Sequence, residues 1–431
     1  MSAAEPGTAL IPGAPTPAGP DVALPAGAHG LSAAVLSGTL VAVNALAYVF
    51  TVLAARTLSP AAYGELAALL GVLLVGAVPA SGLQTHAALQ LGARGEDPAV
   101  VARRVHTAGV VLAVGVGLTG LLASLPLAGL LHLAGPGTAA LLALQFVPYT
   151  LVGGYDGILQ GAGRYGRLAV VTALYGGTRL AGGLIGLLAW GTPTAALAGL
   201  AVGAAGGAAA TWAAAGRPGL AGWRDAPVVP ALRASAALLG FVLLTNLDLL
   251  LARHVLPAAE AGEYAVGSIV FKIVFWLPQG VAVVLLPLLG DPAARLRSLL
   301  RALTVVAGLG AVLTLGAAAL GGTTLRLVGG PAYGASLGSA VWLFAALGTL
   351  LGVAQLLLYS AIASRAAAPV TAVWAAVAAE AAAVVVLDRA GGATVAGVVG
   401  CAVTVAAVLV AYGLVRLLTE LRERASPTLD G

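Results

Sequence analysis

The sequence predicts an all-α integral membrane protein with about twelve transmembrane helices, arranged as two pseudo-symmetric lobes of six helices around a central cavity. Three observations support this fold class. Of the 431 residues, 60% are hydrophobic and 9% are charged, whereas a soluble domain carries roughly 25% charged residues. Apolar stretches long enough to cross a bilayer alternate with short polar breaks. The two halves of the chain carry similar segments about 200 residues apart.

The N-terminal segment, residues 1–31, differs from everything that follows. It contains six prolines and five glycines but no Lys or Arg. A cleavable signal peptide starts with basic residues followed by an apolar run, and neither is present. We therefore expect 1–31 to be a disordered cytoplasmic tail.

Twelve apolar stretches follow, each long enough for a helix that crosses a bilayer. The crossings of a β-barrel are about ten residues long and alternate apolar with polar side chains, so that class is excluded. The predicted spans are residues 32–55, 66–89, 106–130, 138–158, 168–190, 194–214, 233–253, 263–289, 300–322, 338–362, 367–387 and 393–417.

The distribution of basic residues predicts the orientation, because Lys and Arg are retained on the cytoplasmic side. If the N-terminus is cytoplasmic, 15 arginines lie in or at the edges of the even-numbered breaks and the C-terminal tail (419–431), and four lie in or at the edges of the odd-numbered breaks. The remaining two basic residues, Arg179 and Lys272, lie within spans. We therefore expect a multi-pass protein of the cell (cytoplasmic) membrane with both termini in the cytoplasm.

The longest cytoplasmic break between spans, 215–232, divides the membrane region into an N-terminal lobe (32–214) and a C-terminal lobe (233–418), and the two lobes resemble each other. Residues 44–67 read NALAYVFTVLAARTLSPAAYGELA, and residues 245–268 read TNLDLLLARHVLPAAEAGEYAVGS. Each segment has Ala-Arg at the outer end of a span, then a proline, then a tyrosine at the start of the next span. A six-plus-six repeat is typical of transporters, whose sites lie between the halves near mid-membrane.

The stretches TVLAARTLSPAAYGELAALLGVLLVGAVPASGLQT and NLDLLLARHVLPAAEAGEYAVGSIVFKIVFWLPQGV resemble polysaccharide-biosynthesis membrane proteins. These are the oligosaccharide flippases of the multidrug/oligosaccharidyl-lipid/polysaccharide (MOP) exporter superfamily. The resemblance implies two six-helix lobes around a V-shaped cavity that opens alternately to each side. It implies transport of a lipid-linked glycan or another anionic amphiphile from the inner to the outer leaflet. Membrane lipids are the other expected partners, no cofactor is expected, and a monomer suffices.

Polar side chains inside spans are rare because their insertion is costly, and they recur here on single helical faces. One such stripe in the first span contains Asn44, and one in the eighth contains Lys272 and Gln279. These stripes indicate either a hydrated cavity or hydrogen bonds that hold the helices together. The predicted substrate-cavity residues are Lys272, Arg179, Asp248, Asn44, Asn246, Gln279, Arg56 and Arg253.

The charged members of this set allow two interpretations. Lys272 and Asp248 are expected at similar depth on adjacent helices, where they form a neutralising pair or serve the substrate separately. An electropositive cavity suits a pyrophosphate-linked substrate, because charge is not moved through hydrocarbon without compensation. Arg56 and Arg253 either contribute to this cavity or snorkel to the outer lipid headgroups.

Two further acids are candidates for ion coupling. Glu380 and Asp156 lie within spans, where a carboxylate either changes its protonation during transport or is protonated and bonded to a neighbour. The second candidate function is accordingly a proton- or sodium-coupled antiporter for small molecules or drugs. The first span contains no acid, although drug exporters of the superfamily often carry one there.

Enzyme, metal and nucleic-acid functions are not expected. The five histidines have no metal-binding spacing, and the single cysteine, Cys401, excludes Cys-based metal clusters. Glycosyl transfer would need paired carboxylates close to the first outer break, but Arg56 to Glu65 contains only Glu65. The arginines are scattered over short breaks rather than collected in one patch, which excludes nucleic acid as a partner.

Overall fold

The computed structural model describes residues 28–93, 95–285, 295–333, 337, 340–363 and 368–425. Most of the predicted N-terminal tail and residues 426–431 of the C-terminal tail therefore lie outside the described residues. In the described part, the regular elements are helices without any strand. Eleven of these helices, or pairs of consecutive helices, are long and apolar enough to cross a membrane. The predicted all-α, multi-pass membrane fold is thus confirmed.

The first half of the chain forms seven helices. They are α1 (Ala28–Thr57), α2 (Pro60–Gly76), α3 (Val78–Gly92), α4 (Pro98–Leu130), α5 (Pro136–Gly161), α6 (Tyr165–Trp190) and α7 (Pro193–Ala214). The second half begins with a short 3₁₀ turn, η1 (Trp223–Asp225), and forms seven more helices. These helices are α8 (Val228–Val255), α9 (Ala258–Leu285), α10 (Arg295–Leu320), α11 (Gly322–Gly329), α12 (Val341–Ala363), α13 (Ala368–Arg389) and α14 (Val395–Ala425).

These helices match the predicted spans with three differences. The second span is a single crossing, Pro60–Gly92, that is interrupted at Ala77, beside Pro79. The short helix α11 lies in a break for which no helix was predicted. The predicted eighth span, 263–289, corresponds to α9, which has 28 residues but is not among the eleven candidate spans of the described part.

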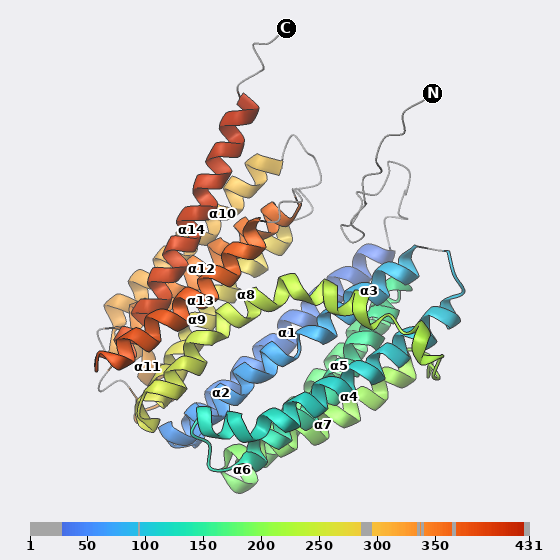
Figure 1. Ribbon diagram of the computed structural model, residues 1–431, viewed down its shortest axis with the longest axis horizontal. Coiled ribbons are helices and arrows are strands. Elements are labelled where there is room, and N and C mark those ends of the chain that lie inside the picture. The colour runs from blue at the N-terminus through green and yellow to red at the C-terminus, as the bar shows by residue number, and fades with distance from the viewer. Residues whose placement is uncertain are drawn as a thin grey trace, which may run out of the picture.

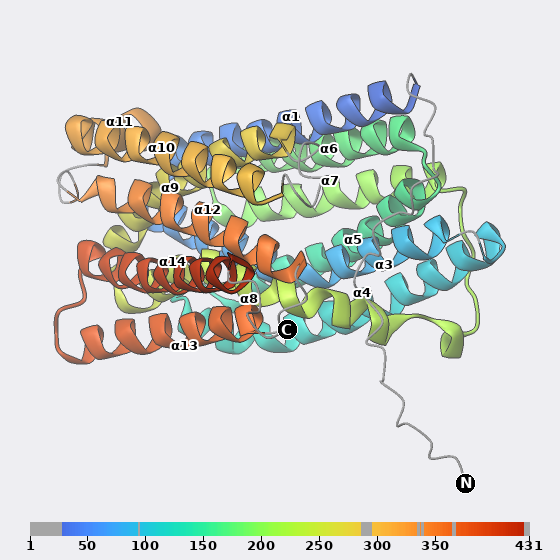
Figure 2. The same cartoon turned by 90° about the horizontal axis from the view of Figure 1, so that it is seen from above.

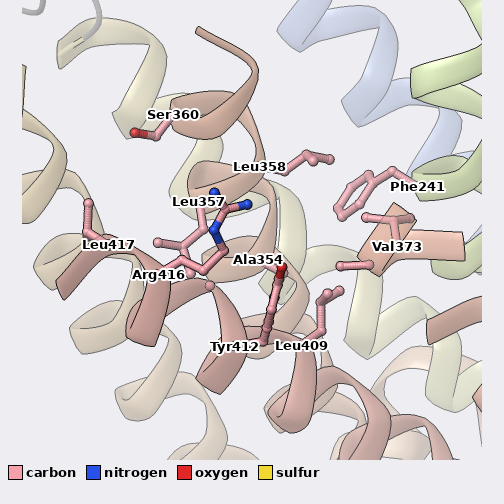
Figure 3. Close-up of a pocket in the computed structure, with 12 residues that line it drawn as sticks. Phe241, Ala354, Leu357, Leu358, Ser360, Val373, Leu409, Tyr412, Arg416 and Leu417 are labelled. Atoms are coloured by element: carbon pink, nitrogen blue, oxygen red, sulfur yellow. The ribbon is translucent and has the colours of Figure 1, made fainter. Parts of the chain in front are cut away.

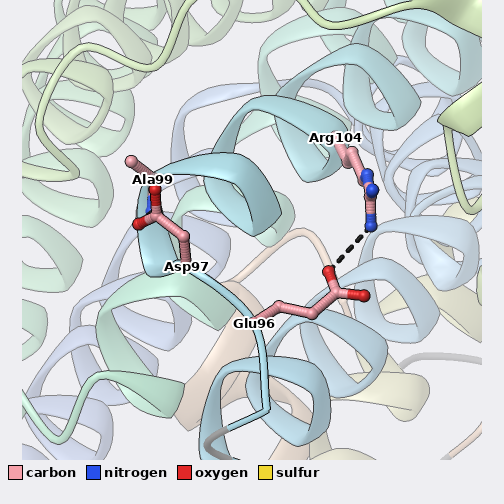
Figure 4. Close-up of polar contacts among 4 residues, drawn as sticks. All are labelled: Glu96, Asp97, Ala99 and Arg104. Atoms are coloured by element: carbon pink, nitrogen blue, oxygen red, sulfur yellow. Dashed lines mark hydrogen bonds and ion pairs between the residues drawn. The ribbon is translucent and has the colours of Figure 1, made fainter.

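Three of the tight connections use the same local chemistry. Ser59, Asp97 and Thr192 each cap a helix whose first residue is proline, and each side chain accepts a hydrogen bond from a backbone N–H of the first turn. At the start of α4, Asp97 bonds the amide of Ala99 at 2.9 Å (Figure 4). Proline is preorganised for this position, since its missing N–H would have no helical partner there. Breaks of a few residues are therefore enough to reverse the chain.

The helices run back and forth between two ends of the molecule (Figure 2). We call the end where α1 and α8 finish and α11 lies the convergent end, and the end where α1 starts and α14 finishes the divergent end. Figure 1 shows the axes of α10, α12 and α14 swinging away from those of α3, α4 and α5 toward the divergent end. The helices thus form two lobes, α1–α7 and α8–α14, in a V arrangement.

Glycines allow the helices within a lobe to approach closely, as the pair α6 and α7 shows. A Cβ atom added at Gly199 would lie 2.0 Å from the carbonyl oxygen of Gly182, and one at Gly203 would lie 2.1 Å from that of Thr178. Small residues are the usual device for such contacts in membranes, where the hydrophobic effect does not drive helices together. The glycines of this pair therefore serve helix packing.

The start of α8 packs with the N-terminal lobe, although it follows the inter-lobe linker. Ala231 is fully buried in an apolar cluster with Leu83 and Val105 of that lobe. The amide of Ala221 in the linker donates a 2.8 Å hydrogen bond to Thr107 of α4. The predicted division at 232–233 therefore lies inside a helix, and α8 leaves the N-terminal lobe only further along its length.

Candidate functional site

The interface between the lobes is built mainly from α2 and α3 on one side and α8 and α9 on the other. Asn246 of α8 lies in this interface with 3% of its surface exposed. Its side-chain nitrogen donates to the carbonyl of Val242 at 2.8 Å, while its amide oxygen has no hydrogen-bond partner. That oxygen faces Gly71 of α2, where an added Cβ would lie 3.8 Å away. Asn246 is therefore a buried polar contact between the lobes.

A second polar group lies inside the C-terminal lobe, and we call it the C-lobe polar cluster. Its members come from α8, α9 and α13: Asp248, Tyr264, Lys272 and Glu380. Asp248 and Glu380 are each 2% exposed and interact electrostatically. The hydroxyl of Tyr264 donates to Asp248 at 2.8 Å. Lys272 interacts electrostatically with Asp248, but no ion pair within 4.0 Å joins these two described residues.

The C-lobe polar cluster suits the exchange of a cation. Two buried carboxylates repel each other when both are charged, and an uncompensated charge at this depth is costly. One oxygen of Glu380 has no hydrogen-bond partner, so it is free to accept a proton or a cation. Within the described residues, no group of three or more His, Cys, Asp and Glu could hold a metal ion.

The N-terminal lobe has a polar group of its own on α5 and α6, which we call the N-lobe polar cluster: Tyr149, Asp156, Tyr175 and Arg179. The guanidinium of Arg179 lies 5.8 Å from the centre of the Tyr149 ring, and Tyr149 packs edge-on against Tyr175 at 6.1 Å. Arg179 Nε and one oxygen of Asp156 are buried without hydrogen-bond partners. Among the described residues, an aromatic ring rather than an ion pair therefore accompanies this cation.

Arg56 and Arg253 lie at the convergent end, and each reaches across to the other lobe. Arg253 of α8 is 5% exposed and donates to the carbonyl oxygens of Leu131 at 2.8 Å and His132 at 3.1 Å. Arg56 of α1 donates to the carbonyls of Val328, at 3.2 Å, and Leu327. In this conformation, both arginines bind the backbone.

The structure also places the remaining predicted residues. Asn44 is exposed on α1, whereas the side chain of Gln279 lies outside the described residues. The pattern alone had missed Tyr264 as the partner of Asp248, and it had not placed Glu380 beside Asp248. The repeat did mark Tyr264, because a tyrosine starts the following span in both halves.

The described structure has two cavities of note, one within each lobe, and neither of the two lies between the lobes. One of about 60 Å³ lies among α8, α12, α13 and α14, with Arg416 and Tyr412 beside apolar side chains such as Phe241 (Figure 3). It has room for a few waters. The other, of about 620 Å³, lies among α4, α5 and α7 and has an almost wholly apolar lining, with His106 and Tyr155 among its few polar residues. Its lining suits hydrocarbon rather than a charged head group.

The structure is similar to solved transporters of the MOP superfamily. The lipid II flippase MurJ in an inward closed conformation aligns with a TM-score of 0.68 at 14% identity, covering 89% of this chain and 87% of that one. A MOP transporter from Pyrococcus furiosus gives 0.59 at 14% identity, covering 90% and 96%. An outward-facing MATE multidrug-resistance transporter gives 0.56 at 12% identity, covering 93% and 98%.

The sequence matches no protein-family model, and no curated protein matches it. At 12–14% identity, these similarities establish the fold. The chain is a multi-pass membrane protein with the fold of MOP-superfamily transporters. The predicted fold is thus confirmed, while membership of the oligosaccharide flippase family stays a prediction.

Proposed function

We propose that this protein is a flippase that moves an anionic, lipid-linked oligosaccharide or cell-surface polysaccharide precursor across the cytoplasmic membrane. The two lobes would expose the substrate path alternately to each side. The observation that carries this proposal is the pair of basic residues inside the spans, Arg179 and Lys272, neither of which has an ion pair within 4.0 Å among the described residues. A pyrophosphate needs such groups because its charge does not enter hydrocarbon uncompensated. The solved structures that share this fold include a lipid II flippase.

The proposal includes an orientation in which the divergent end faces the cytoplasm. The described turns at that end are bordered by Arg103, Arg104, Arg164 and Arg167. At the convergent end, Arg56 and Arg253 are occupied in hydrogen bonds between the lobes. Because cytoplasmic turns retain basic residues, this arrangement supports a state in which the lobes separate on the cytoplasmic side, where a precursor made in the cell would enter.

A second candidate function, the ion-coupled small-molecule antiporter, is favoured by one observation. Asp248 and Glu380 are buried together in the C-lobe polar cluster. Such a pair would bind a coupling proton or sodium ion, or a cationic drug. In a flippase, the same pair would couple transport to an ion gradient. The cluster is therefore compatible with both functions, and only the identity of the substrate distinguishes them.

The decisive experiment uses the full chain in proteoliposomes with a fluorescent polyprenyl-pyrophosphate-linked oligosaccharide, and follows its movement between leaflets by quenching. We expect the wild type to move this probe, and Lys272→Ala and Arg179→Ala to slow it by about tenfold or more. Lys272→Arg should retain part of the rate, since charge matters more than shape. Arg389→Ala, an exposed arginine of α13, is the matched control. A wild type that exchanges a cationic dye for ions but leaves the glycolipid in place would contradict the proposal.

A double variant separates a ligand role of Lys272 from a structural one. If Lys272 only neutralises Asp248, Lys272→Ala leaves a buried carboxylate uncompensated and destabilises the protein. Adding Asp248→Asn should then restore both the protein level and the transport. We expect the double variant to fold but remain inactive, and recovery of transport would assign Lys272 to the structure of the lobe.

A further inference from the structure

The convergent end contains two arginine contacts that are related by the internal repeat. Arg56 and Arg253 follow equivalent alanines, Ala55 and Ala252, in the last turns of α1 and α8, 197 residues apart. Arg56 binds the carbonyls of Leu327 and Val328 at the end of α11. Arg253 binds those of Leu131 and His132 at the end of α4. We call these the Arg56 clasp and the Arg253 clasp. Each lobe donates one arginine and receives the other.

Both arginines bind the opposite lobe through backbone carbonyls at helix ends, and neither bond requires an acidic side chain. The last carbonyls of a helix lack intrahelical partners and carry partial negative charge, and both clasps end on such groups. A guanidinium is planar and presents several donors, so it can bind two neighbouring carbonyls at once. Separation of the lobes at this end would break bonds from a charged donor. It would also leave carbonyls unpaired wherever water cannot replace the arginine.

The backbones also touch beside the clasps. Gly64 of α2 and Gly262 of α9 follow their arginines by eight and nine residues. A Cβ at Gly64 would lie 3.0 Å from the amide nitrogen of Gly262, and a Cβ at Gly262 would lie 2.0 Å from the carbonyl oxygen of Pro60. This contact brings the lobes near enough for the arginines to reach across. The convergent end is therefore closed by backbone contact and by two hydrogen-bonded clasps.

We infer that the Arg56 and Arg253 clasps are the gate of the convergent end, and that both break when the two lobes separate there. The inference rests on the alternating access of the proposed function, and it names the residues that regulate this access. Each clasp joins the lobes independently of the other, so loss of one should weaken the closed state and loss of both should abolish it. The substrate path would then open to the side that the clasps now close.

The test measures the distance between the lobes at both ends by double electron–electron resonance. In the full chain with Cys401→Ser, spin labels at Gly137→Cys and Ala390→Cys report the convergent end. Labels at Gly166→Cys and Leu300→Cys report the divergent end. All four residues are exposed, and each pair has one residue in each lobe. The clasp variants are Arg56→Gln, Arg253→Gln and the double variant, and Arg389→Gln is the control.

We expect both single variants to raise the ratio of long to short convergent-end distances, Arg56→Gln by about tenfold and the more deeply buried Arg253→Gln by more. The double variant should raise it by about the product of the two single effects, a hundredfold or more, because separated contacts contribute additively in free energy. The divergent-end distance should shorten in parallel, and Arg389→Gln should resemble the wild type. A folded, monodisperse double variant with unchanged distances at the convergent end would overturn the inference. If Arg253→Gln fails to fold, Arg56→Gln alone must still show the shift.

The two proposals fail separately. The distances are measured without substrate, so the gate is tested even if the chain moves no glycolipid. Shifted distances together with immobile pyrophosphate glycolipid would leave the gate standing and refute the flippase. Unchanged distances together with transport of the glycolipid would refute the gate and leave the flippase.

Discussion

The two clasps occupy equivalent places in the repeat but differ in their surroundings. Arg253 is 5% exposed and has a third acceptor, the carbonyl of Ala61 at 3.4 Å, while Glu65 interacts with it electrostatically. Arg56 is exposed and has two acceptors. The same Ala-Arg motif therefore makes a buried contact in one half and an exposed one in the other, because the receiving lobe differs.

The receiving elements account for this difference. Arg253 binds the end of α4, a helix of 33 residues, and the neighbouring His254 lies 2.8 Å from the Leu130 carbonyl and stacks on His132. Arg56 binds the end of α11, which has eight residues. A long helix anchored in its lobe presents its last carbonyls more rigidly than a single short one does. The Arg253 clasp should therefore dominate the closure of the convergent end.

The polar clusters of the two lobes also differ, in the charges that they hold. The C-lobe cluster holds two carboxylates, each 2% exposed, near one lysine. The N-lobe cluster holds one carboxylate and an arginine that faces an aromatic ring. The two carboxylates of the first suit a small cation, whereas its lysine and the arginine of the second suit an anionic group. The two lobes therefore carry polar clusters that differ both in their helices and in their chemistry.

The largest effect is expected at the glycine contact, where the equivalent glycines of the two lobes differ strongly in the space around them. Gly262→Ala places a methyl group 2.0 Å from a backbone oxygen, whereas the nearest atoms to a methyl at Gly64 are 3.0–3.2 Å away. Gly262→Ala should abolish the closed convergent end and cost about 3 kcal/mol of stability, and Gly64→Ala about 1 kcal/mol. Gly206→Ala, which has open space around it, is the control. Thermal unfolding in detergent and the label distances check this, and equal effects of both glycine variants would remove the asymmetry.

The next largest effect concerns the arginines. Arg253→Ala removes a buried charged donor from the carbonyls of Leu131 and His132, and it should lower the free energy of unfolding by about 3 kcal/mol. Arg56→Ala should lower it by about 1 kcal/mol, since water can replace an exposed donor. Equilibrium unfolding of the two variants under identical detergent conditions measures the difference. A larger loss in Arg56→Ala would reverse the ranking of the clasps.

A third prediction distinguishes the polar clusters by their ion dependence. Glu380→Gln removes one of two neighbouring carboxylates, and transport should lose most of its response to a proton or sodium gradient, by about tenfold. Asp156→Asn in the other lobe should keep that response. Uptake measured with and without each gradient provides the test. A variant of Asp156 that loses coupling while Glu380→Gln retains it would move the ion site to the N-terminal lobe.

The smallest effects are expected outside the lobe interface, at the start of α4. The ion pair between Glu96 and Arg104, at 2.7 Å, has side chains that are 54% and 35% exposed (Figure 4). Glu96→Gln should change stability by less than about 0.5 kcal/mol. Asp97→Ala removes the helix cap and should cost about 1 kcal/mol. Unfolding of both variants gives the comparison, and a larger loss for Glu96→Gln would show that this pair is worth more than its exposure suggests.

Much of the fold could be predicted because a membrane span is a local property. A run of about 20 apolar residues must bond its own backbone in lipid, whatever surrounds it. Eleven crossings of the described part accordingly coincide with predicted spans, and the predicted eighth coincides with α9. The interruption at Ala77 and the short helix α11 were not predicted, because each depends on how neighbouring segments pack.

The site was predicted less completely, since its partners are distant in the chain. The amino-acid sequence by itself determined which residues are charged inside an apolar chain, among them Asp248, Lys272 and Glu380, and that Arg56 and Arg253 are repeat equivalents. Only the tertiary structure brought Glu380 beside Asp248 and directed both arginines to carbonyls of the opposite lobe. Every residue carries a backbone carbonyl, so such acceptors have no signature in the sequence. The packing of the helix ends decides which carbonyls the arginines bind. The close contact of Gly64 with Gly262 helps to fix that packing.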